Sequence, residues 1–256
     1  MNFTFTIVTV TLNNYEGLLN TYDSITIQSS RDYQWVVIDG NSSDDTCKFL
    51  TSLKKSGSQV KWISENDSGI YNAMNKGVSL SDGDYVIFLN AGDVFADNEV
   101  LQDIIYTDAL YNYDIVYGNS FEQKKDKEFF LKRARKHNFI WYGMFTHHQA
   151  ILYKREMLIL NPYSENLTIA SDYDLTSKLI LKEYSCKYID SAICKFELGG
   201  LSIVNYRLSL KEQMQVRKNN FKWPIPLYHC FYLYQYILYF IRNNIPFIYI
   251  TYRKLF

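Results

Sequence analysis

The segment VIFLNAGD, residues Val86 to Asp93, passes from a fully apolar run directly into an amide, two small residues and a carboxylate. A short, continuously apolar run that ends in a turn is typical of a strand buried on both faces. Asn90 and Asp93 would then lie at the carboxyl end of this strand, where open parallel sheets bind their ligands. We therefore predict a buried strand that carries polar side chains to a functional site.

Three earlier strands are predicted to end in the same way. Each apolar run leads into a loop that carries Asp or Asn: Phe5 to Val10 into TLNN, Trp35 to Ile38 into DGNS, and Val60 to Ile63 into ENDSG. Apolar residues recur at helical spacing from Ile70 to Val78, between the third run and the strand Tyr85 to Leu89. Strands that alternate with helices predict an α/β fold with a mostly parallel sheet, and its four polar loops should meet at one edge.

The pattern continues less regularly after Asp93. A helix is predicted from Asp44 through Leu53 and another from Asp172 through Ile180, capped by Ser171. The charged segment Glu122 to Lys136 predicts a solvated loop or exposed helix. Two further strands are expected, at Ile115 to Gly118 and Ala150 to Tyr153.

Composition narrows the class of protein. At 256 residues and 47% hydrophobic, the chain can bury one large core, so we expect one catalytic domain followed by a tail. Lys plus Arg and Asp plus Glu each number 27, which gives no general attraction to nucleic acid. The four cysteines lack CxxC spacing and predict buried thiols. The start, MNFTFTIVTVTLNN, lacks the features of a signal peptide and predicts a cytoplasmic catalytic part.

The C-terminal tail differs in composition from the rest of the chain. Residues 223–256 are crowded with Tyr, Phe, Ile and Leu, but prolines and the triplet Arg242-Asn243-Asn244 interrupt the apolar run. Such a tail predicts attachment at a membrane surface, with basic residues meeting anionic head groups: Arg217, Lys218, Lys222, Arg242, Arg253 and Lys254. The alternative is a pair of helices packed onto the catalytic domain.

Three stretches together resemble a known family: TIVTVTLNN, WVVIDGNSSDDT and SENDSGIYNAMNKGVSLSDGDYVIFLNAGD. They resemble the nucleotide-sugar-binding half of glycosyltransferase family 2, inverting enzymes of the GT-A fold. The resemblance is strong over residues 5–120 and weaker through HHQAILYKRE and SDYDLTSKLI to about residue 204. It implies a catalytic domain at 1–204, with a nucleotide-sugar-binding half at 1–120 and an acceptor-binding half at 121–204. A helical tail at 205–256 would follow.

The resemblance implies roles for residues in the first three loops. Thr9, Asn13 and Asp39 would contact the uracil and ribose of a UDP-sugar donor, and Asp67 would also contact the donor. Lys76 would reach a phosphate. Alternatively, Asp39 caps the segment that follows it, and Lys76 is an ordinary solvated helix lysine.

The fourth loop departs from the family pattern. The family usually ends this strand with Asp-x-Asp, whereas this chain has Asn90, Ala91 and Gly92, with Asp93 the remaining acid. Asp93 is therefore the expected ligand of Mn²⁺ or Mg²⁺, which would neutralise the leaving diphosphate. Asn90 and Ala91 are expected to contact the donor. A metal-independent enzyme stays open.

Inversion requires one base that deprotonates the attacking hydroxyl of the acceptor. The family uses the Asp of a Glu-Asp pair near the start of a helix, which Ser171-Asp172 matches with Ser in place of Glu. The resemblance thus makes Asp172 the base and Asp174 the fallback. Alternatively, both are first-turn acids favoured by the helix dipole.

Two more segments are assigned by the resemblance. His148 and Gln149 of the triplet HHQ would lie near the donor diphosphate or the acceptor. Gly200, in the sequence GGLS, would belong to a loop that closes over the site, although ordinary turn chemistry explains these glycines too.

The implied activity is transfer of a hexose or N-acetylhexosamine from a UDP-sugar to a bacterial surface glycan, of the O-antigen or capsule type. The acceptor would be carried on a polyprenyl diphosphate at the inner face of the membrane, with no nucleic acid involved. A nucleotidyltransferase would instead need a Gly-rich phosphate loop with a basic residue, which Thr9 to Asn14 does not offer. A non-catalytic binding or scaffold protein of the same fold is the other alternative.

Overall fold

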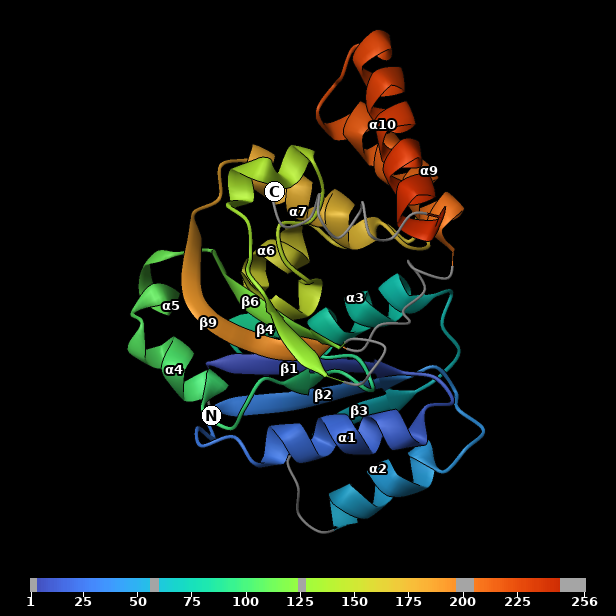
Figure 1. Ribbon diagram of the computed structural model, residues 1–256. Helices are drawn as coiled ribbons and strands as arrows, with labels where there is room; N and C mark the ends of the chain where they lie inside the picture. Colours follow the sequence, from blue (N-terminus) through green and yellow to red (C-terminus); the bar gives the residue numbers. More distant parts are fainter. Residues whose placement is uncertain (1–3, 56–59, 124–127, 197–204, 245–256) are drawn as a thin grey trace.

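The computed structural model describes residues 4–55, 60–123, 128–196 and 205–244 (Figure 1). Within them, nine strands form one sheet in the order β3-β2-β1-β4-β8-β6-β9-β5, and β7 pairs with β6. The strands are β1 Phe5–Thr11, β2 Tyr33–Asp39, β3 Val60–Ser64, β4 Tyr85–Phe88, β5 Val94–Phe95, β6 Ile115–Gln123, β7 Phe129–Lys132, β8 Ile151–Lys154 and β9 Cys186–Phe196. Strands β1 to β4 are mutually parallel, as predicted, whereas β8 is antiparallel to both β4 and β6.

Helices cover both faces of the sheet (Figure 1). They are α1 Tyr15–Thr26, α2 Thr46–Lys55, α3 Ile70–Leu80, α4 Val100–Tyr106, α5 Ala109–Asn112, α6 Arg155–Leu160, α7 Ser171–Leu181, α9 Tyr206–Asn220 and α10 Ile225–Asn244, with 3-10 turns η1 His137–Trp141 and η2 His148–Ala150. Helices α1, α2 and α4 pack into one apolar core, and α3, α6 and α7 into a second core on the opposite face. The predicted α/β architecture is confirmed.

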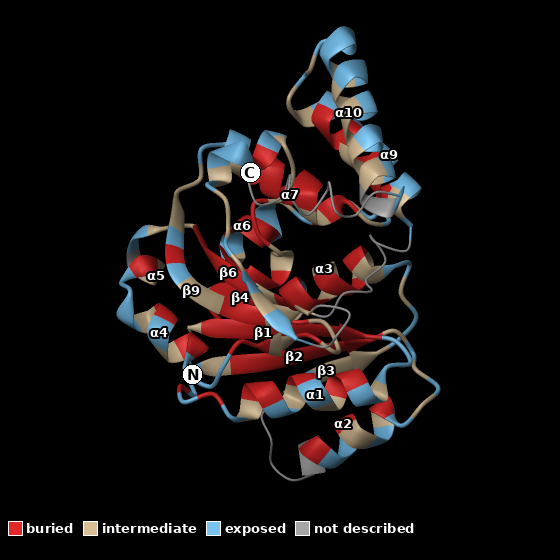
Figure 2. Cartoon of the chain, in the orientation of Figure 1, coloured by how far each residue is buried: buried red, intermediate tan, exposed pale blue. Residues whose placement is uncertain are grey.

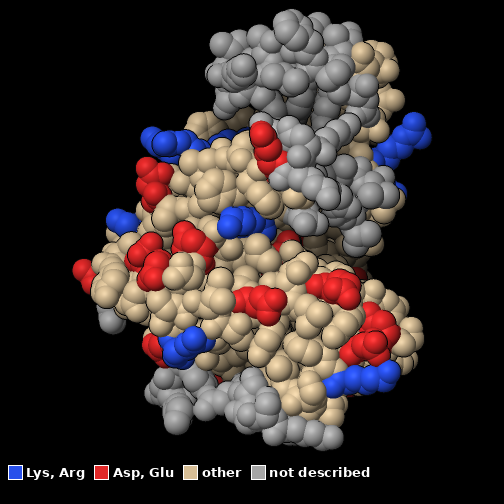
Figure 3. Space-filling view, turned by 60° about the horizontal axis from the view of Figure 1, so that its bottom comes forward, with Lys and Arg blue, Asp and Glu red and all other residues tan. Residues whose placement is uncertain are grey.

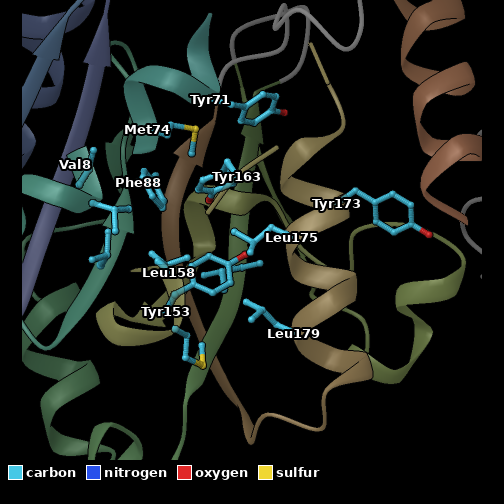
Figure 4. Close-up of a cluster of buried hydrophobic side chains, with 14 of the residues drawn as sticks. Val8, Tyr71, Met74, Phe88, Tyr153, Leu158, Tyr163, Tyr173, Leu175 and Leu179 are labelled. Carbon is cyan, nitrogen blue, oxygen red and sulfur yellow. The ribbon is translucent and has the colours of Figure 1, made fainter. Parts of the chain in front are cut away.

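The central strands lie between these two cores and are buried along their length (Figure 2). Figure 4 shows the core that joins α3 to α7, with Phe88, Tyr163 and Leu175 turned toward one another. Gly77 lets α3 approach the sheet closely, because a Cβ there would lie only 2.3 Å from a methyl group of Val8. Close packing of α3 fixes the loop that precedes it at the carboxyl edge of the sheet.

The segment Glu122 to Lys136 is only partly the predicted loop, because of its described residues only 128 and 133–136 lie outside helices and strands. It contains the end of β6 and all of β7, which pairs antiparallel with β6. The prediction failed because β7 is an edge strand whose side chains alternate between exposed and half-buried, so its charged neighbours remain solvated. Strand β9 was also missed, since polar residues interrupt its apolar pattern and its register with β6 shifts near Asn119.

Ser171 is not the cap of α7. The N-cap is Ala170, and the hydroxyl of Ser171 is buried in the first turn without a hydrogen-bond partner in the described structure. A cap residue must lie outside the helical backbone, whereas here the helix begins at Ser171 itself. Side-chain capping therefore does not explain where α7 starts.

The tail begins with a helix that packs onto α7. Arg217 of α9 is only 1% exposed and donates to the carbonyls of Trp141, at 3.1 Å, and Tyr142, at 2.5 Å. The expectation that Arg217 meets lipid head groups is wrong, because its guanidinium is buried and hydrogen-bonded inside the protein. No helix in the described part of the chain is long and apolar enough to span a bilayer.

Candidate active site at the strand ends

The loops after β1 and β2 are tied together by Asn13. Its backbone N–H donates to the Ser42 hydroxyl at 2.8 Å, and its side-chain oxygen accepts from the backbone N–H of Ser43 at 2.8 Å. Asn13 has a φ of 50°, a left-handed conformation that Asn adopts more readily than most residues. The sequence prediction that these loops meet at one edge is confirmed.

Asp39, the last residue of β2, is fully buried behind this junction. Its carboxylate accepts hydrogen bonds from the backbone N–H and hydroxyl of Ser42, from the Ser64 hydroxyl at 2.6 Å and from the Cys47 thiol at 3.3 Å. Asp39 thus holds the turn that leads toward α2, and it is not the cap of that helix, which begins seven positions later at Thr46. Of these partners, only Ser42 lies in the hydroxyl-rich run NSSDDT that follows Asp39, so the sequence offered a signal for that partner alone.

Asp67 and Lys76 form an ion pair at the end of β3. The ammonium lies 2.6 Å from Asp67 and 2.8 Å from Glu65, and it also donates to the carbonyl of Asn66 at 3.2 Å. Hydrogen bonds to the two carboxylates raise the pKa of Lys76, so it stays charged. Lys76 is therefore held against the loop rather than free in solvent. We call Asn13, Asp39, Asp67 and Lys76 the nucleotide side.

Thr9 is not brought to this group. Its side chain is buried in β1, and its hydroxyl accepts from the indole N–H of Trp35 at 3.0 Å. Gly200 lies outside the described residues. Of the residues expected to contact the nucleotide, the structure thus places Asn13, Asp39 and Asp67 at the strand ends and buries Thr9 beneath them.

The loop after β4 is a tight turn. The N–H of Asp93 donates to the carbonyl of Asn90 at 2.8 Å, and Gly92 between them has a φ of 106°. Residues with a side chain rarely adopt this backbone conformation, which favours glycine at a position where the family usually has an acid. The carbonyl of Ala91 accepts from the Asn14 amide at 2.9 Å, so the turn is anchored at the start of α1.

The turn is linked to η2 and α7 by three polar contacts. Gln149 donates to Asp93 at 2.9 Å, and the Nε2 of His148 lies 3.4 Å from the amide nitrogen of Asn90. The Nδ1 of His148 lies 3.9 Å from a carboxylate oxygen of Asp172. Burial lowers the pKa of His148, opposed by the charge of Asp93, so the imidazole is neutral at neutral pH. We call these five residues the transfer side.

Asp172 has the properties of a base that works near neutral pH. Burial raises the pKa of its carboxyl to about 6, opposed mainly by the hydrogen bond from the Tyr173 N–H, which measures 2.7 Å. Its side chain is still 21% exposed, so the carboxylate is not sealed from solvent. Asp174 points elsewhere, because it pairs with Lys178 at 2.6 Å and accepts from Asn220 of α9 at 3.0 Å. The structure separates the two candidates.

The donor set fits a divalent cation only if the substrate completes it. No three His, Cys, Asp or Glu side chains converge as a metal site within residues 4–55, 60–123, 128–196 and 205–244. However, the amide oxygen of Asn90 is buried without a partner in this part of the chain, three residues from the Asp93 carboxylate. One carboxylate and one amide oxygen, completed by diphosphate oxygens and water, is a normal arrangement for Mg²⁺.

Comparison with known proteins identifies the family. The family model of glycosyl transferase family 2 matches residues 6–164. The chain belongs to glycosyl transferase family 2. Similar curated proteins include a PGL/p-HBAD biosynthesis glycosyltransferase of Mycobacterium bovis, 28% identical over 77% of this chain and 78% of that protein. The amylovoran biosynthesis glycosyltransferase AmsB of Erwinia amylovora is 24% identical over 88% of this chain and 76% of its own.

Solved structures confirm the GT-A fold of this family 2 transferase. Staphylococcus aureus TarS in complex with UDP superimposes with a TM-score of 0.64 at 16% identity, over 95% of this chain and 74% of that chain. The mannosyltransferase PcManGT from Pyrobaculum calidifontis, in complex with GDP-Man and Mn²⁺, gives a TM-score of 0.67 at 16% identity, over 93% and 70%. At these identities the likeness establishes the fold alone.

Proposed function

We propose that this glycosyltransferase moves a hexose or N-acetylhexosamine from a UDP-sugar to a glycan hydroxyl with inversion. The observation that carries the proposal is Asp172, a buried but accessible carboxylate with a raised pKa that faces the turn after β4 through His148. A single base of this kind is what direct displacement at a sugar carbon requires. The UDP and UDP-GlcNAc bound in structures of the similar TarS fold support the choice of donor.

The two sides of the site have complementary roles in this reaction. Asn13 and Asp67 bind the nucleoside, with the buried Asp39 holding the loop that Asn13 contacts, while Asp93 and the Asn90 amide oxygen would hold Mn²⁺ or Mg²⁺. When bound, the cation neutralises charge on the leaving diphosphate. Asp172 accepts the proton of the acceptor hydroxyl. The oxygen of that hydroxyl forms the new bond to the sugar carbon, and the bond from this carbon to the diphosphate breaks on the opposite face. The Mn²⁺ bound by PcManGT supports this choice of cofactor.

We further propose that the acceptor is a lipid-linked glycan, reached from the inner membrane surface through α10. Large apolar side chains are exposed on this helix: Ile225, Leu227, Tyr232, Leu233, Tyr236, Ile237 and Phe240. No acidic residue follows Glu212 in the sequence, whereas five lysines and arginines do besides the buried Arg217. An exposed apolar helix face in a segment whose sequence is net positive suits an anionic lipid surface. Relatives named for PGL/p-HBAD and amylovoran biosynthesis support a role in surface glycan assembly.

Both signs of charge occur on the face shown in Figure 3, separated by neutral surface. Together with the zero net charge, this argues against nucleic acid as a partner.

A non-catalytic protein of the same fold is the competing proposal, and it predicts binding of nucleotide sugars without turnover.

The experiment that tests the reaction measures UDP release from a panel of UDP-sugars with Mn²⁺ and a lipid-diphosphate acceptor. Asp172→Asn is expected to lower kcat by about 10²–10⁴-fold with donor affinity unchanged, because the base is lost while the nucleotide side is intact. Asp174→Asn is the matched control and should retain most activity. Turnover unchanged in Asp172→Asn, or lost only in Asp174→Asn, would overturn the assignment; donor binding without release in wild type would favour the non-catalytic protein.

Membrane attachment is tested by flotation with vesicles of anionic or zwitterionic lipid. The double change Leu233→Glu with Ile237→Glu is expected to reduce binding to anionic vesicles by at least about tenfold, because two exposed apolar contacts are replaced by negative charge. Leu160→Glu with Ile159→Glu, on the exposed part of α6, is the matched control. Equal binding by both variants would contradict the role of α10. Loss of self-association instead of lipid binding would assign the helix to contact between copies.

A further inference from the structure

Three consecutive backbone N–H groups, immediately before the helix that carries Asp172, converge on one buried carboxylate. Glu212 of α9 accepts from Thr168 at 2.9 Å through one oxygen, and from Ile169 at 2.8 Å and Ala170 at 3.0 Å through the other. Its side chain belongs to the buried set, at 7% exposure. Neither the resemblance nor the motif pattern pointed to Glu212, because in the sequence it is one acid within a polar helical segment.

Within the described residues, backbone N–H groups compensate the burial of this charge. No lysine, arginine or histidine forms an ion pair with Glu212 in the stretches that the structure describes. An isolated buried carboxylate is costly, whereas one that accepts several N–H hydrogen bonds is well satisfied. Ala170 is the N-cap of α7 and has no capping side chain of its own. Glu212 therefore accepts, from another helix, a backbone N–H at the start of α7 that a local capping side chain would otherwise satisfy.

The same loop is held from the opposite side by α3. The Tyr71 hydroxyl donates to the carbonyl of Ile169 at 2.6 Å, and the Tyr71 ring stacks on Tyr163 with centroids 5.6 Å apart. Residues 168–170 thus lie between a donor on α3 and an acceptor on α9. A loop bonded on both sides has little freedom to rotate or shift, and neither does the helix start that follows it.

A second contact from α9 restrains the residue after Asp172. The guanidinium of Arg217 lies 5.1 Å from the ring centre of Tyr173, and Tyr173 points to the opposite side of α7 from Leu175 and Leu179 (Figure 4). The Tyr173 N–H in turn donates to Asp172. Helix α9 therefore touches the chain both before and after Asp172.

We propose that Glu212 is a positioning residue for transfer: it fixes the start of α7 so that the Asp172 carboxylate faces His148 and the turn after β4. The proposal rests on the proposed function of Asp172 as base. The hydrogen bonds of Glu212 go to residues 168–170 and not to Asp172, and its negative charge also contributes to the raised pKa of Asp172. Misplacing a catalytic group by about 1 Å can cost about 10²-fold in rate, so a residue that does not touch the substrate can still change the rate of transfer.

The test is Glu212→Gln, which keeps the length and shape of the side chain. Its amide N–H₂ would face backbone N–H groups, so one of the two accepting oxygens becomes a donor and the loop loses partners. We expect kcat to fall by about 10–100-fold with KM for the UDP-sugar changed by less than about twofold. Hydrogen exchange at the amides of residues 168–170 should become at least about tenfold faster. Glu183→Gln, the same change on an exposed residue two positions after α7, is the control.

Two outcomes would overturn the positioning role. One is unchanged kcat in Glu212→Gln while Asp172→Asn is inactive, which leaves the base assignment standing. The other is a fall in activity that the folded fraction at the assay temperature accounts for entirely, which shows a stabilising role only. Activity retained in Asp172→Asn would instead refute the proposed base, and faster exchange at residues 168–170 would then report the loop contact by itself.

Discussion

The nucleotide side and the transfer side lie on the same sheet edge but differ in how their polar groups are satisfied. Asp39 accepts from three side chains and a backbone N–H, and Asp67 pairs with Lys76. On and beside the transfer side, the Asn90 amide oxygen and the Ser171 hydroxyl are buried without partners in the described structure. Buried polar atoms are normally paired, so the transfer side is the part that a ligand would complete. On the nucleotide side, the carboxylates of Asp39 and Asp67 already have partners within the protein.

The difference extends to charge. Lys76 gains two carboxylate partners and stays charged, whereas burial makes ionisation of Asp172 costly. A binding surface benefits from charges that are fixed by partners, while a general base benefits from a pKa near the working pH. The two sides therefore predict different responses to the same kind of substitution.

After the loss of the base itself, the largest expected effect concerns the metal. Asp93→Asn should lower the Mn²⁺-supported kcat/KM by about 100-fold, because it removes the one carboxylate of the turn after β4. Asn90→Asp should instead reduce the Mn²⁺ concentration for half-maximal activity by about tenfold, since it adds a charged ligand. Activity titrated with Mn²⁺ measures both, with Asp103→Asn on the exposed face of α4 as control. If Asp93→Asn behaves like this control, Asp93 does not bind the metal.

The pH dependence should be governed by the transfer side. Asp172 must be ionised to accept a proton, so kcat/KM is expected to fall about tenfold per pH unit below about 6 and to level off above it. A kcat/KM profile over the acidic range measures this limb. A rate that stays flat down to about pH 4 would exclude Asp172 as the group that titrates, since its pKa is raised to about 6.

The smallest effect is on stability, and its sign should differ between the two sides. The pKa of Asp172 rises from 3.8 to about 6 on folding, so the folded state favours the proton and stability falls as pH rises through this window. At neutral pH, Asp172→Asn should therefore raise the free energy of unfolding by about 1–3 kcal/mol. Asp39→Asn should lower it by about 1–3 kcal/mol, because its new N–H₂ faces hydroxyl donors.

Urea unfolding of both variants at neutral pH measures this pair. The comparison between the two sides would fail if both substitutions destabilised the protein by similar amounts. A stabilised Asp172→Asn that is also inactive would show that the enzyme tolerates a costly buried charge for the sake of the reaction.

The four parallel strands and α3 could be predicted because each shows its own local pattern of apolar residues. Strand β7 and strand β9 could not, since edge position and pairing with β6 make polar sequences acceptable there. Among site residues, Asn13, Asp39 and Asp93 follow from their place at strand ends. Thr9 misled because strand side chains alternate, and its hydroxyl points to Trp35. The prediction that Arg217 contacts lipid was wrong because the sequence around it is typical of an exposed basic segment.

The sequence by itself determined the α/β architecture, the edge at which the site lies and the family, since strand ends, helical periodicity and motif spacing are all local properties. Only the tertiary structure decided which of Asp172 and Asp174 faces the turn after β4, and that Glu212 holds the loop before them. Those choices depend on the direction of a side chain around a helix and on contacts between residues more than 40 positions apart. Such contacts leave no periodic pattern in the chain, because each involves one residue on each element.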